Sequence, residues 1–92
     1  MSVDTILFAL TKLERQTQIA SHHDLGEKRR LLLTVGYMRD QLLRNDPVAF
    51  TNTVDSGLAA HPDLYDHIMD SLYETLGIST RERFDEILAS DI

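Results

Sequence analysis

Histidines and carboxylates fall close together in one segment of the sequence and are the first candidates for chemistry. His67 follows Asp63 by four residues and precedes Asp70 by three, so a helix would place these side chains on one side. Carboxylate di-iron bundles need a Glu-x-x-His motif on each of two helices, and the sequence contains none. We therefore expect no metal and no cofactor, and interpret the segment as a solvated acidic face.

A serine in the same segment raises a second chemistry. Asp70-Ser71-Leu72 is similar to the tripeptide at which acyl carrier proteins bear phosphopantetheine on the serine. In that family the serine begins a helix after a long loop, whereas Ser71 falls in the middle of a predicted helix. We expect Ser71 to border the core instead.

Catalytic motifs are missing from the sequence. It contains no glycine-rich phosphate loop, no Gly-x-Ser-x-Gly elbow, no His-Glu-x-x-His helix and no cysteine. A thin helical bundle would also leave little volume for an enclosed substrate pocket. We therefore predict that the protein is not an enzyme.

The charge is distributed unevenly. Residues 1–44 contain seven Lys or Arg and five Asp or Glu, whereas residues 45–92 contain two and ten. Lys28-Arg29-Arg30 could contact phosphate, but the segment 46–80, where a recognition helix could lie, contains no Lys or Arg. We predict no direct contact with nucleic acid.

Helical periodicity and capping signals run through the whole sequence. Apolar residues recur at steps of three and four in five segments. Each segment is bounded by capping residues, a proline or a glycine. The expected helices cover about residues 3–20, which Ser2 could cap, then 24–44, 47–61, 62–76 and a last helix opened by a Ser79–Glu82 capping box.

These segments predict an all-α fold, a single compact bundle of about five helices over residues 1–92. Residues 3–44 would form a helical hairpin, and three shorter helices would follow. Gly36 and Gly57 lie inside predicted helices at a cost of up to about 1 kcal/mol each. A close helix contact could explain them, and the alternative is a kink or an error in the predicted helix boundaries. With no cysteine, no signal peptide and no apolar run of membrane-spanning length, we expect a cytoplasmic protein with no membrane contact.

Four carboxylates on the outer side of the helix predicted over 62–76 lead to our main functional hypothesis. They are Asp63, Asp66, Asp70 and Glu74. We predict a non-catalytic protein interaction module, such as an adaptor, an inhibitor or a small subunit, that presents this acidic face to a basic partner surface. A sharper version is a phage-type inhibitor that acts as a nucleic-acid decoy. The competing interpretation is a face that only solubilises the protein.

Apolar residues that lie off the predicted helix seams lead to the alternative hypothesis. A structural homo-oligomer, such as a homodimer, could bury them between copies. We prefer the interpretation that they are buried within the monomer, because a five-helix bundle encloses some helices on two sides. These residues are Phe8, Ile19, Leu33 and Tyr37.

Overall fold

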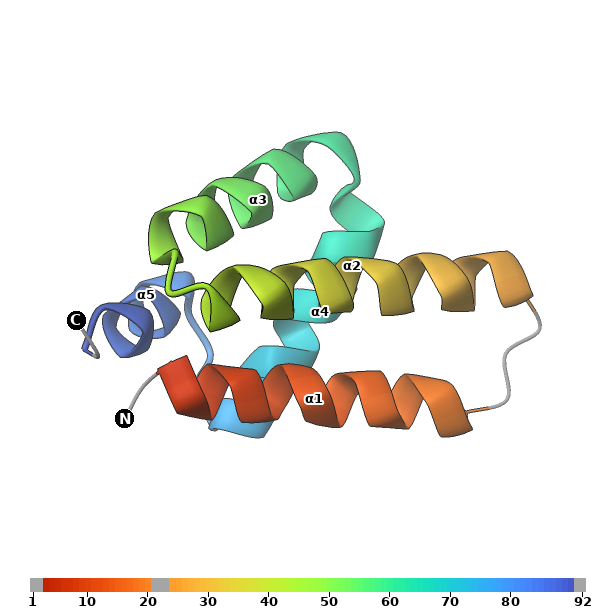
Figure 1. Cartoon of the computed structure of the whole chain (residues 1–92), viewed down its shortest axis with the longest axis horizontal. Helices are drawn as coiled ribbons and strands as arrows, with labels where there is room; N and C mark the ends of the chain where they lie inside the picture. The colour runs from red at the N-terminus through yellow and green to blue at the C-terminus, as the bar shows by residue number, and fades with distance from the viewer. Residues whose placement is uncertain (1–2, 21–23, 91–92) are drawn as a thin grey trace.

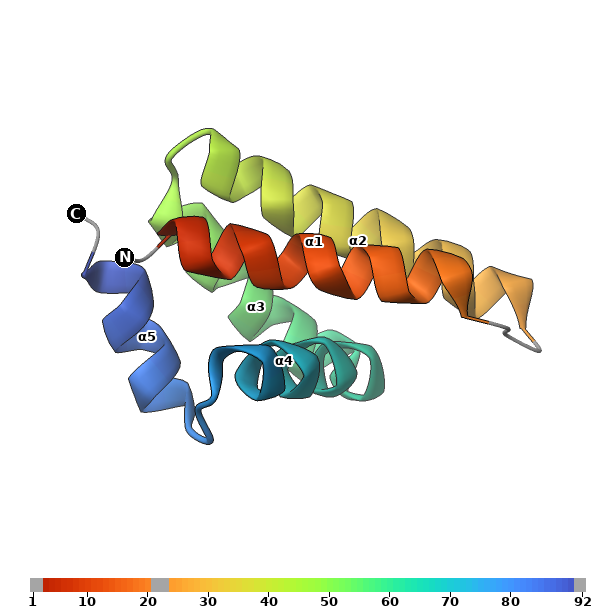
Figure 2. The same cartoon turned by 90° about the horizontal axis from the view of Figure 1, so that it is seen from below.

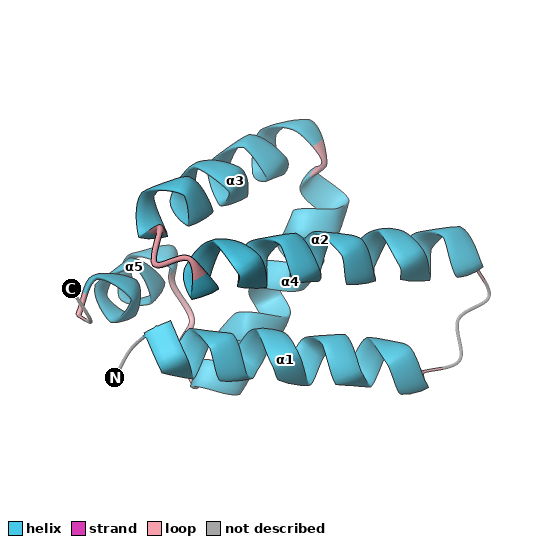
Figure 3. Ribbon diagram, in the orientation of Figure 1, coloured by secondary structure: helices cyan, strands magenta, loops and turns pink. Residues whose placement is uncertain are grey.

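Five helices joined by short connections make up the computed structural model, which describes residues 3–20 and 24–90. Within these ranges all regular structure is helical, which confirms the predicted all-α class (Figure 3). The helices are α1 (Val3–Ile19), α2 (Leu25–Leu43), α3 (Pro47–Ala60), α4 (Pro62–Leu76) and α5 (Arg81–Ala89).

The helices pack in two layers. α1 and α2 lie side by side as an antiparallel hairpin, and α4 crosses behind them (Figure 1). Figure 2 shows α4 beneath the hairpin, so that α1 and α2 each keep one face that no other helix covers. α3 packs against both α2 and α4, while α5 contacts α1 near the start of the chain.

Side-chain caps begin the helices largely where the sequence predicts them. The Asp24 carboxylate accepts hydrogen bonds from the backbone N–H groups of Gly26 at 2.8 Å and Glu27 at 3.1 Å. Asp46 caps α3 in the same way by accepting from Ala49 at 3.0 Å. The predicted cap Ser2 lies outside the described residues.

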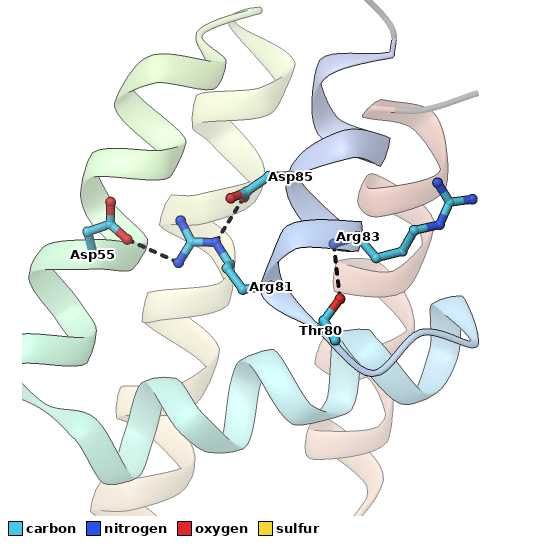
Figure 4. A network of polar contacts seen from close by, with 5 residues as sticks. All are labelled: Asp55, Thr80, Arg81, Arg83 and Asp85. Atoms are coloured by element: carbon cyan, nitrogen blue, oxygen red, sulfur yellow. Dashed lines mark hydrogen bonds and ion pairs between the residues drawn. The ribbon is translucent and has the colours of Figure 1, made fainter.

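The start of α5 differs from the prediction by one residue. Thr80, rather than Ser79, is the N-cap, and its hydroxyl accepts a hydrogen bond from the Arg83 backbone N–H at 3.1 Å (Figure 4). Glu82 therefore occupies the second helical position, where it is not placed to complete the predicted capping box. The sequence offers two adjacent hydroxyl residues, and the backbone entry into the helix decides between them.

Two helices end with left-handed residues. Gly77 has a φ of 72° after α4, and the Ile78 N–H donates to the Tyr73 carbonyl at 2.9 Å, as in a Schellman motif. Asn45 plays the same part after α2 with a φ of 59°. These endings turn the chain sharply, so each helix meets the next with few connecting residues.

The predicted apolar seams form one core. Phe84 of α5 stacks on Phe50 of α3, with 6.1 Å between the ring centroids. Its ring centroid also lies 6.0 Å from that of the tilted Tyr73 ring of α4. Ser71 is half-buried in the middle of α4, as expected. The seam residues that are buried include Ile6, Leu10, Leu13, Leu31, Val35, Met38, Leu42, Phe50, Val54, Ile68, Met69, Leu72, Phe84 and Leu88.

The two mid-helix glycines have different environments. A Cβ atom on Gly57 would overlap the ring of Tyr65, so this glycine permits the close contact of α3 with α4 that we expected. A Cβ atom on Gly36 would meet nothing within 4 Å. The expected close contact at Gly36 is therefore wrong within this chain, and α2 runs through it without interruption.

Candidate interaction surfaces

The acidic face of α4, defined as Asp63, Asp66, Asp70 and Glu74, lies where the sequence predicts it. All four residues are exposed, and the opposite side of α4 places Tyr65, Ile68, Met69 and Leu72 in the core. Within the described ranges none of the four carboxylates forms an ion pair or a hydrogen bond. The face is thus unpaired negative charge on a helix that the core holds in place.

Other carboxylates in the molecule do find cations. Glu14 of α1 pairs with Arg39 of α2 at 2.5 Å. Arg81 lies between Asp55 of α3 and Asp85 of α5, at 3.0 Å and 2.9 Å (Figure 4). Burial alone would lower the pKa of Arg81, but its hydrogen bonds and the charges of Asp85 and Asp55 outweigh burial and raise it. The arginines therefore stabilise contacts between helices and leave the α4 carboxylates without partners.

Two grooves border the acidic face. At the Asp63 end, α2 and α4 enclose a groove of about 420 Å³, with Arg30 and His67 on its rim and Leu31 among its lining residues. At the Glu74 end, a smaller groove of about 210 Å³ lies between α1 and α4. Lys12 lines this second groove together with Glu74, but the two do not form an ion pair. One cation thus borders each end of an otherwise negative surface.

The three residues of the basic triplet, Lys28, Arg29 and Arg30, have different surroundings. The Lys28 ammonium group donates to the backbone carbonyls of Gln18 at 2.9 Å and Ala20 at 3.4 Å, closing the end of α1. The Arg30 guanidinium lies 2.7 Å from Nδ1 of His61. The Arg29 side chain has no ion-pair or hydrogen-bond partner among residues 3–20 and 24–90. Within these ranges, Arg29 is therefore the member of the triplet that remains as solvated charge.

The four off-seam apolar residues are exposed, so our preferred interpretation of burial within the monomer is wrong. The exposed fractions are 67% for Phe8, 79% for Ile19, 68% for Leu33 and 58% for Tyr37. The physical reason is the two-layer arrangement, which covers only the inner sides of α1 and α2. Whether these residues mediate self-association stays a prediction.

These four residues do not share one flank of the hairpin. Phe8 and Ile19 follow the ridge of α1 that includes Lys12, which borders α4. Tyr37 of α2 lies on the other flank, close enough to Tyr65 of α4 to influence its pKa. Burial is the main cause that raises the pKa of Tyr65, Tyr37 raises it further, and the Arg30 charge opposes both. A single self-association face made of all four is therefore not the arrangement observed.

The sequence reasoning missed a third surface, which we call the α2 outer stripe. It follows one side of α2 at steps of three and four residues, a signal that was visible in the sequence. Leu25 and Leu43 are 75% and 64% exposed, and the half-buried Leu32 is not part of the core. The stripe consists of Leu25, Arg29, Leu32, Gly36, Asp40 and Leu43.

The described ranges contain neither a metal-binding cluster nor a membrane-spanning helix. No cluster of three or more His, Asp or Glu side chains there could hold a metal ion, and none of the helices has both the length and the apolar character needed to cross a bilayer. The surfaces that the structure offers for recognition include the acidic face of α4, the α2 outer stripe and the two grooves that border the acidic face. In comparisons with known proteins, no family model, no curated protein and no solved structure matches this chain.

Proposed function

We propose that the protein is a non-catalytic interaction module that presents the acidic face of α4 to a basic surface of a partner protein, as an adaptor, an inhibitor or a small subunit. The observation that carries the proposal is the state of Asp63, Asp66, Asp70 and Glu74. All four are exposed and unpaired within the described ranges, on a helix whose other side is in the core.

The way α4 is held supports this use. Proline at the first position and a left-handed glycine at the end fix both ends of the helix. The carboxylates are therefore presented with little loss of backbone freedom when a partner binds. Complementary charge would speed the encounter and select among partners.

The acidic face also has a cost. Asp66, Asp70 and Glu74 follow one another at steps of four residues, so their like charges repel by a few tenths of a kcal/mol per pair. Within the described ranges no basic residue relieves this repulsion through an ion pair. A cationic partner would do so, and this is why we favour recognition over a purely solubilising role.

A narrower form of the proposal is a decoy for a protein that binds nucleic acid. Successive carboxylates of the acidic face are separated by about 4.5 to 6 Å along the helix axis, whereas a DNA strand presents one phosphate per about 3.4 Å of axis. The face therefore has a lower charge density than DNA. A decoy of this kind would cover part of a basic groove rather than fill it.

Affinity capture from the native host tests the proposal, with Asp66→Lys/Asp70→Lys as the variant and Asp4→Lys/Glu82→Lys as its charge-matched control. All four positions are exposed, and both doubles change the net charge equally. We expect the α4 variant to lose the partner and the control to keep it. Equal capture by wild type and both variants, or equal loss in both, would refute the acidic-face proposal.

Salt and competing DNA sharpen the same experiment. Because the contact is electrostatic and exposed, we expect moderate salt to release the partner. Displacement of the captured partner by double-stranded DNA would support the decoy form. Capture that resists salt would instead indicate apolar contacts.

A further inference from the structure

The α2 outer stripe has an unusual centre. Gly36 lies in the middle of a 19-residue helix, where glycine costs about 1 kcal/mol relative to alanine. At Gly57 this cost is offset by the close contact with Tyr65, but nothing lies within 4 Å of a Cβ placed on Gly36. The monomer gives no reason for a glycine at this position, and an approaching helix backbone would.

The positions of the stripe other than Leu25 are spaced symmetrically about Gly36. Leu32 and Asp40 lie four residues before and after it, and Arg29 and Leu43 lie seven residues before and after it. A two-fold axis through Gly36 would therefore place Leu32 level with Asp40 of a second copy, and Arg29 level with Leu43. Antiparallel helices related in this way form an isologous interface.

The charges of the stripe match in that arrangement. At about 1.5 Å of rise per residue, Arg29 and Asp40 of the other copy would lie about 4.5 Å apart along the axis, within reach of an ion pair. Both residues are exposed, and neither side chain has an ion-pair partner among the described residues. The two-fold axis would create this pair twice.

The leucines match as well. Leu43 of the second copy would lie level with Arg29, between Leu25 and Leu32. The more exposed leucines, Leu25 and Leu43, would therefore pack against apolar side chains of the other copy at each end of the interface. Gly36 at the centre would allow the two helix backbones to approach closely, as small residues do where helices cross.

We propose that two copies of this chain associate through antiparallel α2 helices that cross at Gly36. The surface differs from the acidic face of α4, and the proposal does not depend on the function proposed above. The helix is only about 28 Å long, so the interface is small, and we expect a dissociation constant in roughly the micromolar range.

Single cysteine variants test the geometry directly, because the chain has no cysteine of its own. In the proposed dimer two Gly36→Cys residues meet on the axis, so mild oxidation should link them rapidly. Two Leu43→Cys residues would lie about 21 Å apart and should not link. Phe8→Cys, on the exposed side of α1, is the background control.

The crosslinking outcomes are distinct. Rapid linking of Gly36→Cys alone supports the antiparallel dimer. Comparable linking of Gly36→Cys and Leu43→Cys indicates a parallel pair and overturns the proposed geometry. Linking of Gly36→Cys no faster than Phe8→Cys overturns the proposal.

Charge exchange is the second test, read by sedimentation equilibrium over a wide concentration range. Arg29→Asp and Asp40→Arg should each weaken dimerisation by about tenfold, and the double variant should restore it because the pair is recreated with reversed polarity. Asp66→Lys/Asp70→Lys is the control that should leave the dimer intact. Single variants without effect, or a double variant without rescue, would contradict the ion pair.

Gly36→Gln separates folding from association. Glutamine favours the helix and its Cβ would meet no atom within 4 Å in the monomer, so the melting temperature should rise while the dimer is lost. A wild-type chain that stays monomeric up to about 1 mM, where even a weak contact would form, overturns the proposal. Association with an amphipathic helical peptide but not with itself would assign the stripe to another protein. Neither result would affect capture through the acidic face.

Discussion

The acidic face of α4 and the α2 outer stripe are both outer sides of helices whose inner sides are in the core, yet they differ in what they can bind. The α4 face presents four charges of one sign, so it repels a copy of itself. The stripe presents one cation, one anion, three leucines and a glycine, and its positions from Arg29 to Leu43 are spaced symmetrically about the glycine. A face of one sign requires a different partner, whereas a face with balanced charges can match itself.

The two surfaces also differ in how closely the surrounding structure packs against their helices. α4 is stabilised by contacts with both α1 and α3, and Tyr65 lies directly against Gly57 of α3. The outer stripe of α2 has open space around Gly36. Substitutions on the inner side of α4 should therefore destabilise the protein far more than substitutions on the outer stripe of α2, and four measurements test this difference.

The largest change in the free energy of unfolding should come from a substitution on the inner side of α4. Ile68 has no exposed surface, so Ile68→Ala should lower the free energy of unfolding by about 2–5 kcal/mol through lost burial and a cavity. Leu43→Ala on the outer stripe should change it by less than about 0.5 kcal/mol in dilute, monomeric protein. Urea unfolding measures both. A large loss at Leu43 would show that the stripe belongs to the fold.

The two glycines provide the second contrast. Gly57→Ala should destabilise the protein by about 1–3 kcal/mol, because the added methyl group overlaps the Tyr65 ring. The same change at Gly36 should stabilise it by up to about 1 kcal/mol, because the methyl group meets no atom and alanine favours the helix. Thermal unfolding of the two variants checks the sign. Effects of the same sign would contradict the different environments.

Alkaline pH should cause a smaller loss of stability through the buried Tyr65 and the half-buried Tyr73. Burial raises the pKa of Tyr65 and of Tyr73 above the ordinary value of 10.0, although nearby Arg30 and Arg81 oppose the shift. The folded state therefore keeps these protons longer than the unfolded chain. Their contribution to stability should be complete below pH 10 and decline as the pH rises through the folded-state pKa values.

A tyrosine variant isolates the contribution of Tyr65 to this pH dependence. Tyr65→Phe keeps the ring against Gly57 and removes the ionisable hydroxyl, so its stability should decline less steeply above pH 10 than that of wild type. Chemical denaturation at a series of pH values measures the slope. An identical slope in the variant would show that Tyr65 does not contribute to it.

The smallest effect should come from the acidic face itself. Asp70→Asn removes repulsion with Asp66 and Glu74, so it should stabilise the helix by a few tenths of a kcal/mol at low salt. The gain should disappear at high salt, because these charges are exposed. Unfolding at two ionic strengths measures the difference. A loss of stability would indicate that Asp70 has a favourable contact in the monomer.

Inner surfaces were more predictable from the sequence than outer ones. Three- and four-residue spacing identified the buried seam of α2, with Leu31, Val35 and Met38, because burial on one side imposes that period. The same spacing could not tell how many sides of α1 and α2 the other helices cover, so the exposure of Phe8 and Tyr37 was not foreseen. That depends on crossing geometry, which many residues determine together.

The glycines illustrate the same limit. Gly36 and Gly57 both interrupt predicted helices, and only the position of Tyr65 after folding distinguishes them. The acidic face was predictable because it lies opposite an unambiguous apolar side. The symmetry of the α2 outer stripe was present in the sequence, but it becomes meaningful only once the open space around Gly36 is known.

The attachment of α5 affects how the molecule opens. This nine-residue helix is held by Phe84, which stacks on Phe50 and contacts the tilted ring of Tyr73, by the buried Leu88, and by the Arg81 pair with Asp55. Only a few contacts must break to release α5, so we expect its amide hydrogens to exchange with solvent before those in α1 to α4. The protein would then have a minor form in which the Phe50 ring is accessible to water while the other four helices remain folded.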